Sequence, residues 1–312
     1  MRVRRSQLIA ILAAAFLVIL AGGAALAWVL SAPHPAFSEA DAVDLERPGD
    51  PVRGRLVFAA GDCASCHASP GQLDRLRLGG GLALASPFGT FRVPNISMDP
   101  DVGIGHWRTI DLANALMSGV SPSGQHLYPA LPYTSYAHMR LDDVRDLMAY
   151  LRTLAPVAGR PPPHELSFPF TIRRAIGLWK LLYLDRTPII PDNAHDAAWN
   201  RGHYLVVALG HCVECHSSRN LLGAVKSATR FAGGPDQEGV VYVPNITPDR
   251  IGHWTANDLV TVLTTGYTPD LRYVGSSMAD VVSNTASLPE SDRDAIASYI
   301  KALPPRPTPP PS

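Results

Sequence analysis

The stretch Cys63-Ala64-Ser65-Cys66-His67 recurs further along the chain as Cys212-Val213-Glu214-Cys215-His216. A pair of cysteines spaced by two residues and followed directly by a histidine therefore occurs twice and uses all four cysteines of the chain. Three flanking matches recur at nearly the same offset: residues 53–54 with 201–202, residues 93–96 with 243–246, and residues 104–107 with 251–254. Several matches at one offset indicate an internal repeat, so we predict two copies of one module.

This motif is the attachment signature of c-type haem. Its two thiols can form thioethers with the vinyl groups on one porphyrin edge, and the adjacent imidazole then lies beneath the iron. We therefore predict two covalently bound haems c, one held by Cys63, Cys66 and His67 and the other by Cys212, Cys215 and His216. Among the alternatives, a zinc site would not require a histidine after both cysteine pairs, and a redox dithiol expects a strand–helix–strand setting. Disulfides are the third alternative in an exported chain.

The second module offers one methionine for the sixth position of a low-spin haem iron, which Met or His can fill. Met278 is the only methionine after Met148. Because a soft thioether suits haem iron, we predict Met278 as the distal ligand. His253 is the alternative, but it shares a Gly-His-Trp repeat with His106, which favours a packing or hydrogen-bonding role for both.

The first module contains more methionines. Met117 and Met148 fall in helical apolar patterns and are predicted to be core residues. Met139 precedes the closing helix, where a loop can present a thioether to the iron, so we predict it as the distal ligand with His138 as the alternative. The two ligand loops should differ, since Met139 stands closer to its closing helix than Met278 does.

Each module closes with a helical pattern. Apolar residues follow the three-and-four spacing of a buried helical face at Val144, Leu147, Met148, Leu151 and Leu154, and again at Ile296, Ile300 and Leu303. Shorter helix candidates open the modules at residues 55–60 and 202–209, and no alternating strand pattern is persuasive. The modules are thus predicted to be small, mostly helical domains with long loops.

The expected organisation has five parts: an anchor or signal peptide (1–34), a first haem domain (48–157), a linker (158–195), a second haem domain (196–304) and a disordered, proline-rich tail (305–312). Three consecutive prolines interrupt the linker, and an apolar segment with three cations follows at residues 168–183. We favour a connecting helix packed between the domains for this segment. A partner-docking or membrane-surface role is the alternative.

The N-terminus predicts export. Arg2, Arg4 and Arg5 precede an uncharged apolar run from Leu8 to Leu30, and about 20 such residues cross a bilayer. Because Lys and Arg favour the cytoplasmic side, the rest of the chain should lie outside. A cleaved signal peptide ending near residues 25–27 is the alternative, but its apolar region is usually shorter. We therefore favour a retained anchor in the inner membrane with periplasmic haem domains.

Charge and composition exclude some classes of function. The 27 basic and 27 acidic residues balance, whereas nucleic-acid binding usually requires a basic excess. The 29 prolines and 25 glycines indicate a loop-rich chain.

From about residue 51 to residue 305, the chain resembles the cytochrome c subunits of bacterial periplasmic dehydrogenases. Besides the two haem motifs, the resemblance depends on residues 94–96, 105–107, 126–129, 132–136, 219–220, 244–246 and 278–282. It implies two tandem class I cytochrome c domains, mostly α, with Met139 and Met278 as distal ligands. It also implies that Asn95, Asn245, Trp107 and Trp254 lie near haem propionates or edges.

The expected function is electron transfer and not catalysis by the chain alone. The chain would take electrons from a periplasmic dehydrogenase subunit and pass them to the quinone pool or a terminal oxidase. His/Met ligation raises the potential and leaves no open iron position. The alternatives are a diheme peroxidase, a thiosulfate-oxidising cytochrome, or a haem subunit of a terminal oxidase. The first two need an open or unusual iron ligand.

Overall fold

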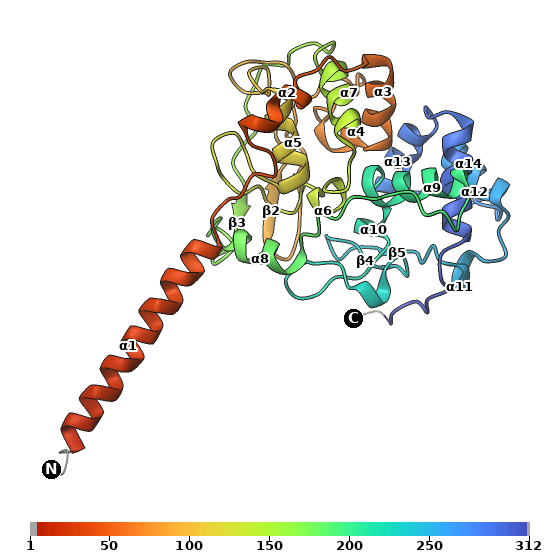
Figure 1. The fold of residues 1–312 in the computed structure, drawn as a ribbon. Coiled ribbons are helices and arrows are strands. Elements are labelled where there is room, and N and C mark those ends of the chain that lie inside the picture. Colours follow the sequence, from red (N-terminus) through yellow and green to blue (C-terminus); the bar gives the residue numbers. More distant parts are fainter. Residues whose placement is uncertain (1–4, 311–312) are drawn as a thin grey trace.

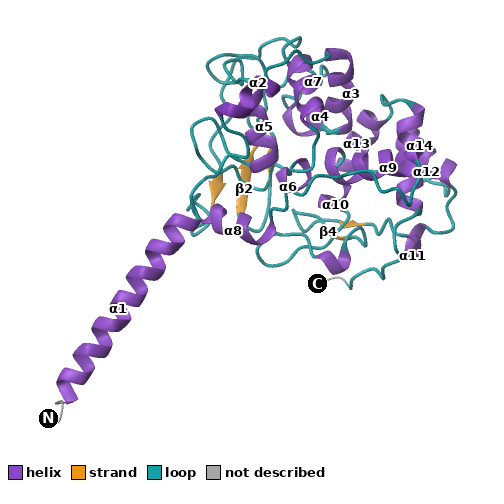
Figure 2. Ribbon diagram, viewed as in Figure 1, coloured by secondary structure: helices purple, strands orange, loops and turns teal. Residues whose placement is uncertain are grey.

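The computed structural model describes residues 5–310 and is mostly α-helical (Figures 1 and 2). Helix α1 (Arg5–Leu30) projects from a body formed by the rest of the chain. It is the one helix within residues 5–310 that is long and apolar enough to cross a membrane. Of the N-terminal cations, Arg2 and Arg4 lie outside the described residues, as do residues 311–312 of the expected tail.

The first half of the body contains six helices and three short strands within the described residues. The helices are α2 (Ala42–Leu45), α3 (Pro51–Ala60), α4 (Cys63–His67), α5 (Thr109–Ser118), α6 (Tyr133–Tyr136) and α7 (Leu141–Leu151). Strand β2 (Gly89–Arg92) lies between β1 (Ala83–Leu84) and β3 (Glu165–Leu166) in an antiparallel sheet. Helix α8 (Ala175–Tyr183) then leads into the second half.

The second half repeats the order from α3 to α7, with α11 added between the motif helix and α12. Its members are α9 (Ala197–Tyr204), α10 (Cys212–Cys215), α11 (Pro248–Ile251), α12 (Ala256–Thr265), α13 (Ser277–Thr285) and α14 (Glu290–Lys301). A π-helical turn, Leu205–Leu209, continues α9. Strands β4 (Gly234–Pro235) and β5 (Tyr242–Val243) pair antiparallel. The sequence pattern did not indicate these strands, because two to four residues are too few to show alternation.

In both halves, the opening helix crosses the closing helix at a glycine. Helix α3 packs on α7 and α9 packs on α14. A Cβ at Gly54 would collide with the carbonyl oxygen of Asp146, and a Cβ at Gly202 with that of Ala295. Glycine is therefore required by the close approach of two backbones, which explains why Arg-Gly recurs before each motif.

We expect Gly202→Ala to lower the guanidinium chloride midpoint of the haem-loaded protein. The added methyl group must push α9 away from α14, and such overpacking costs about 1–3 kcal/mol. Gly275→Ala is the matched control, since no atom lies within 4 Å of its Cβ position. Far-UV circular dichroism measures both midpoints, and equal midpoints would contradict the close-approach argument.

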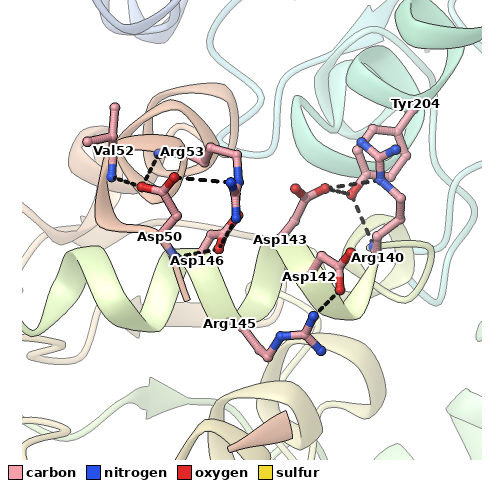
Figure 3. Close-up of polar contacts among 9 residues, drawn as sticks. All are labelled: Asp50, Val52, Arg53, Arg140, Asp142, Asp143, Arg145, Asp146 and Tyr204. Carbon is pink, nitrogen blue, oxygen red and sulfur yellow. Dashed lines mark hydrogen bonds and ion pairs between the residues drawn. The ribbon is translucent and has the colours of Figure 1, made fainter. Parts of the chain in front are cut away.

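Polar contacts fix the opening helix of the first half (Figure 3). Asp50 caps α3 by accepting from the Val52 amide at 2.8 Å, and Pro51 takes the first helical position, which suits proline. Arg53 reaches α7, where its Nε lies 2.7 Å from Oδ2 of the buried Asp146. The second half has the equivalent ion pair between Arg201 and Asp292 at 2.8 Å.

The two halves also contact each other through Tyr204. Its hydroxyl donates to the Asp143 carboxylate on α7 and accepts from the Arg140 amide at 3.0 Å (Figure 3). The Arg140 guanidinium lies over the Tyr204 ring at 4.3 Å. A single cluster of buried apolar side chains includes residues of both halves, so the halves form one packed body.

Two expectations about local structure can be compared directly with the fold. The predicted faces of the closing helices are buried, except that Leu154 is only partly buried. The tail, predicted to be disordered, makes hydrogen bonds with the second half as far as Pro309. The Arg306 carbonyl accepts from the Asn245 amide at 2.8 Å, and the Pro309 carbonyl accepts from the Tyr242 hydroxyl at 2.6 Å. Proline keeps its carbonyl acceptor, and side-chain donors from the second half use the carbonyls of this segment.

Candidate functional site

Each Cys-x-x-Cys-His motif begins at a left-handed residue. Asp62 (φ 55°) precedes α4, and His211 (φ 38°) precedes α10. The reversal starts a new short helix, so that the two cysteines of each motif lie about one turn apart on the same side. This is the placement that two thioethers to one porphyrin edge require.

The two motif histidines are oriented in the same way. Nδ1 of His67 lies 2.9 Å from the Pro94 carbonyl oxygen, and Nδ1 of His216 lies 2.8 Å from that of Pro244. A carbonyl only accepts, so Nδ1 carries the hydrogen and Nε2 keeps its lone pair for a metal. Burial lowers the pKa of both histidines, which favours the neutral, ligating form. The recurring Val-Pro-Asn-Ile stretch thus positions the ligand.

The four thiols are free of disulfides. Burial raises the pKa of Cys63, Cys66 and Cys212 to about 12. A reactive dithiol has a lowered pKa instead, so this environment does not favour a redox dithiol.

Several apolar residues that recur in both halves are only partly buried. Matched pairs at the edge of the core are Cys63 and Cys212, Ile96 and Ile246, and Trp107 and Trp254. A flat apolar group placed there would complete their burial in both halves. Together with paired thiols and an oriented imidazole, this donor set fits a covalently attached haem.

The candidate distal ligands lie on different kinds of segment. Met139 follows α6 and is buried, and its amide donates to the Tyr136 carbonyl at 2.9 Å. Met278 is in the first turn of α13 and is partly buried. The alternative ligand His138 already uses Nδ1 with the Thr187 carbonyl at 2.7 Å. Met139 and Met278 remain predictions as ligands.

Asn95 and Asn245 each bond to the segment that follows the closing helix of the same half, α7 or α14. The Asn95 side-chain amide donates to the Val157 carbonyl at 2.7 Å, and its Oδ1 accepts from the Ser97 amide at 2.9 Å. Asn245 makes the equivalent bonds to Arg306 and Thr247. Both are buried, so their polar atoms serve as loop caps.

Sequence reasoning missed the contacts that bring the two motifs together. Glu214, inside the second motif, accepts from the Thr134 hydroxyl on α6 at 2.7 Å. Burial by itself raises the pKa of this carboxyl, but Arg219, at 2.7 Å, and the Thr134 hydroxyl lower it below its usual value. The charge of Glu214 is therefore held where the halves meet.

The first motif is bound to the second half in return. The Asn284 side chain, on α13, donates to Ser65 Oγ at 3.0 Å and to the Asp62 carboxylate. Arg75 pairs with Asp280 of the same helix at 3.3 Å. Each attachment segment thus contacts the candidate distal-ligand segment of the opposite half. The one sequence signal for contacts between the halves was the repeat of the Cys-x-x-Cys-His motif in two domains of one chain.

A helical fold with two attachment motifs of this geometry defines a c-type cytochrome with two covalently bound haems c. The cytochrome c family model matches residues 51–155, which contain the first motif. A diheme cytochrome c-type protein of Cereibacter sphaeroides is 47% identical over 290 residues, covering 92% of this chain and 96% of that protein.

Two further relatives are larger proteins. The fructose dehydrogenase cytochrome subunit of Gluconobacter japonicus is 37% identical over 81% of this chain. The alcohol dehydrogenase (quinone) cytochrome c subunit of Gluconobacter oxydans is 34% identical over the same share. The chain spans 52% and 54% of their lengths, about half of each. It belongs to the family of c-type cytochromes that includes these proteins, and its role is electron transfer.

Proposed function

We propose that this chain is a membrane-anchored carrier that takes electrons from a periplasmic dehydrogenase and passes them to the respiratory chain. The acceptor would be the quinone pool or a terminal oxidase. The observation that carries the proposal is that each attachment segment contacts the candidate distal-ligand segment of the opposite half, which brings both motifs to the boundary between the halves. Electron transfer slows steeply with separation, so a carrier benefits from two attachment sites side by side.

Ring and backbone contacts support this proximity. The Tyr136 and His211 rings lie 5.5 Å apart between centroids, and the Tyr136 hydroxyl donates to the Gly61 carbonyl at 2.7 Å. Gly61 lies two residues before Cys63, and His211 directly precedes Cys212. One buried tyrosine therefore contacts the chain just before both attachment helices.

The site residues have separate roles in this proposal. Cys63, Cys66, Cys212 and Cys215 form the thioethers, His67 and His216 are the proximal ligands, and Met139 and Met278 are the distal ligands. When bound, each haem supplies an iron that changes oxidation state by one electron. Two protein ligands on each iron leave no position for a substrate, which favours carriage over catalysis.

Helix α1 is the proposed anchor, retained in the inner membrane with the haem domains in the periplasm. Its exposed apolar side chains, such as Leu17 and Val18, make no packed core. Dehydrogenase cytochrome subunits among the relatives suggest the class of the electron donor.

The full chain, extracted from its native membrane in mild detergent, should co-purify with a dehydrogenase. Adding that enzyme's substrate should reduce both haems, which absorbance of the ferrous form measures. Both ferric haems should also show the methionine–iron charge-transfer band. A high-spin haem that reacts with hydrogen peroxide would contradict the carrier and support a peroxidase.

A further inference from the structure

Helix α8 is bonded directly to the last turn of α1. The Arg174 guanidinium donates to the Trp28 carbonyl at 2.6 Å and to Ser31 Oγ at 3.0 Å, and it lies over the Trp28 ring at 4.2 Å. Gly177 packs so closely that a Cβ there would collide with the Ser31 carbonyl oxygen. Figure 1 shows α8 beside the end of α1 from which the body begins.

Buried polar contacts join this junction to the first half. Nε2 of the buried His126 lies 2.9 Å from the Ser31 carbonyl oxygen, to which it donates. Nδ1 of His126 then accepts from Lys180 Nζ at 3.1 Å, and Lys180 also donates to the Ser118 and Gly119 carbonyls at 2.7 Å each. Hydrogen bonds therefore join the end of α1 to both the first half and α8, so the orientation of α1 relative to the body is fixed.

The second half is attached to the same helix. Trp179 Nε1 donates to the Leu222 carbonyl at 2.9 Å, and the Asn220 side-chain amide donates to the Tyr183 hydroxyl at 3.1 Å. The expected connecting helix packed on both halves is thus what residues 175–183 form. Its polar contacts, including that of its lysine, face inward.

The outward face of α8 is apolar. Leu178, Leu181 and Leu182 lie on one face at helical spacing and are 37%, 60% and 69% exposed. Phe168 and Ile172, which lead into the helix, are 80% and 47% exposed. We call these five residues the α8 surface. A helix that directs its lysine inward and exposes its leucines lacks an apolar partner on its outer side.

The position of the α8 surface indicates what covers it. Tryptophan near the end of a spanning helix lies at the level of the lipid headgroups, and α8 is bonded to Trp28 and to Ser31, three residues further on. Arg173 and Arg174 directly precede the helix, where Arg174 is bonded to Trp28, and Arg186 follows the helix. An apolar face flanked by cations matches the boundary between acyl chains and anionic headgroups.

We propose that the α8 surface lies in the membrane interface, as a second contact that holds the haem-bearing body in one orientation relative to the bilayer. This inference rests on the proposed function, because α1 must remain as the anchor. The α8 surface is thus covered by lipids of the same membrane that α1 spans.

A lipid cross-linking experiment tests this. The full chain carries photoreactive p-benzoylphenylalanine in place of Leu182, Phe16 or Val43, one position at a time, in vesicles of phosphatidylethanolamine and phosphatidylglycerol. Val43 is 80% exposed and lies on α2, far from α8 in Figure 1. Lipid adducts are expected at positions 182 and 16 but not at 43.

The outcomes separate this inference from the anchor. An adduct at 16 without one at 182 overturns the α8 surface as a lipid contact and leaves the anchor intact. No adduct at 16 overturns the anchor itself. In native membranes, a cross-link from position 182 to another protein in place of lipid would show that a partner subunit covers the surface, which also overturns the proposal.

Haem orientation provides a second measurement. Polarised absorption of the full chain in oriented bilayers should show strong haem dichroism. Replacing both leucines (Leu181→Glu with Leu182→Glu) should lower the dichroism roughly twofold. Charged side chains are not stable among acyl chains, so the α8 surface would leave the membrane and the body would lose its fixed orientation. Val43→Glu is the matched control. Unchanged dichroism in the leucine variant would contradict the second contact.

Discussion

A variant in which Cys212 and Cys215 are both replaced by serine should carry one covalent haem instead of two. Serine cannot form the thioethers, and the second module has no other cysteine to replace them. The first motif lies on its own helix, α4, and keeps its own histidine contact to Pro94. Haem per protein, measured as the pyridine haemochrome, should therefore fall by half.

The matched variant changes Cys63 and Cys66 in the same way and should also keep one haem. Because each motif contacts the opposite half, the remaining haem in each variant reports whether attachment is independent. Two covalent haems in either double variant, or a colourless wild-type protein made in a host that matures cytochromes, would refute covalent attachment at these motifs.

Met278→Ala should leave both haems attached but remove the methionine–iron charge-transfer band of one. The thioether raises the potential of haem iron by favouring the ferrous state. Axial ligands set haem potentials over about 0.8 V, so we expect that haem's potential to fall by roughly 0.2 V. Potentiometric titration followed by absorbance measures this shift.

Met139→Ala should have the same effect on the other haem. Met148→Leu is the control, because Met148 is buried on the core face of α7 and the exchange conserves volume. An unchanged spectrum in the Met278 variant excludes it as the ligand and leaves His253 as the candidate in the second half.

The α8 segment shows where sequence reasoning reached its limit. Its composition predicted either a connecting helix or a surface segment, as alternatives. The structure shows that Lys180 and Trp179 bond to the two halves while Leu181 and Leu182 face outward. One helix can thus serve both roles, because its opposite faces have different surroundings. Periodicity alone did not show which face the lysine would occupy.

The sequence by itself determined the covalent chemistry and the repeat of this protein. Thioether attachment depends on five consecutive residues, and the helices α7 and α14 follow from local apolar spacing, so neither requires knowledge of the fold. Only the tertiary structure decided that Thr134 donates to Glu214, that Asn284 donates to Ser65, and that α8 packs against Ser31. These contacts join segments far apart in the chain, and their partners are selected by the packing of the whole body.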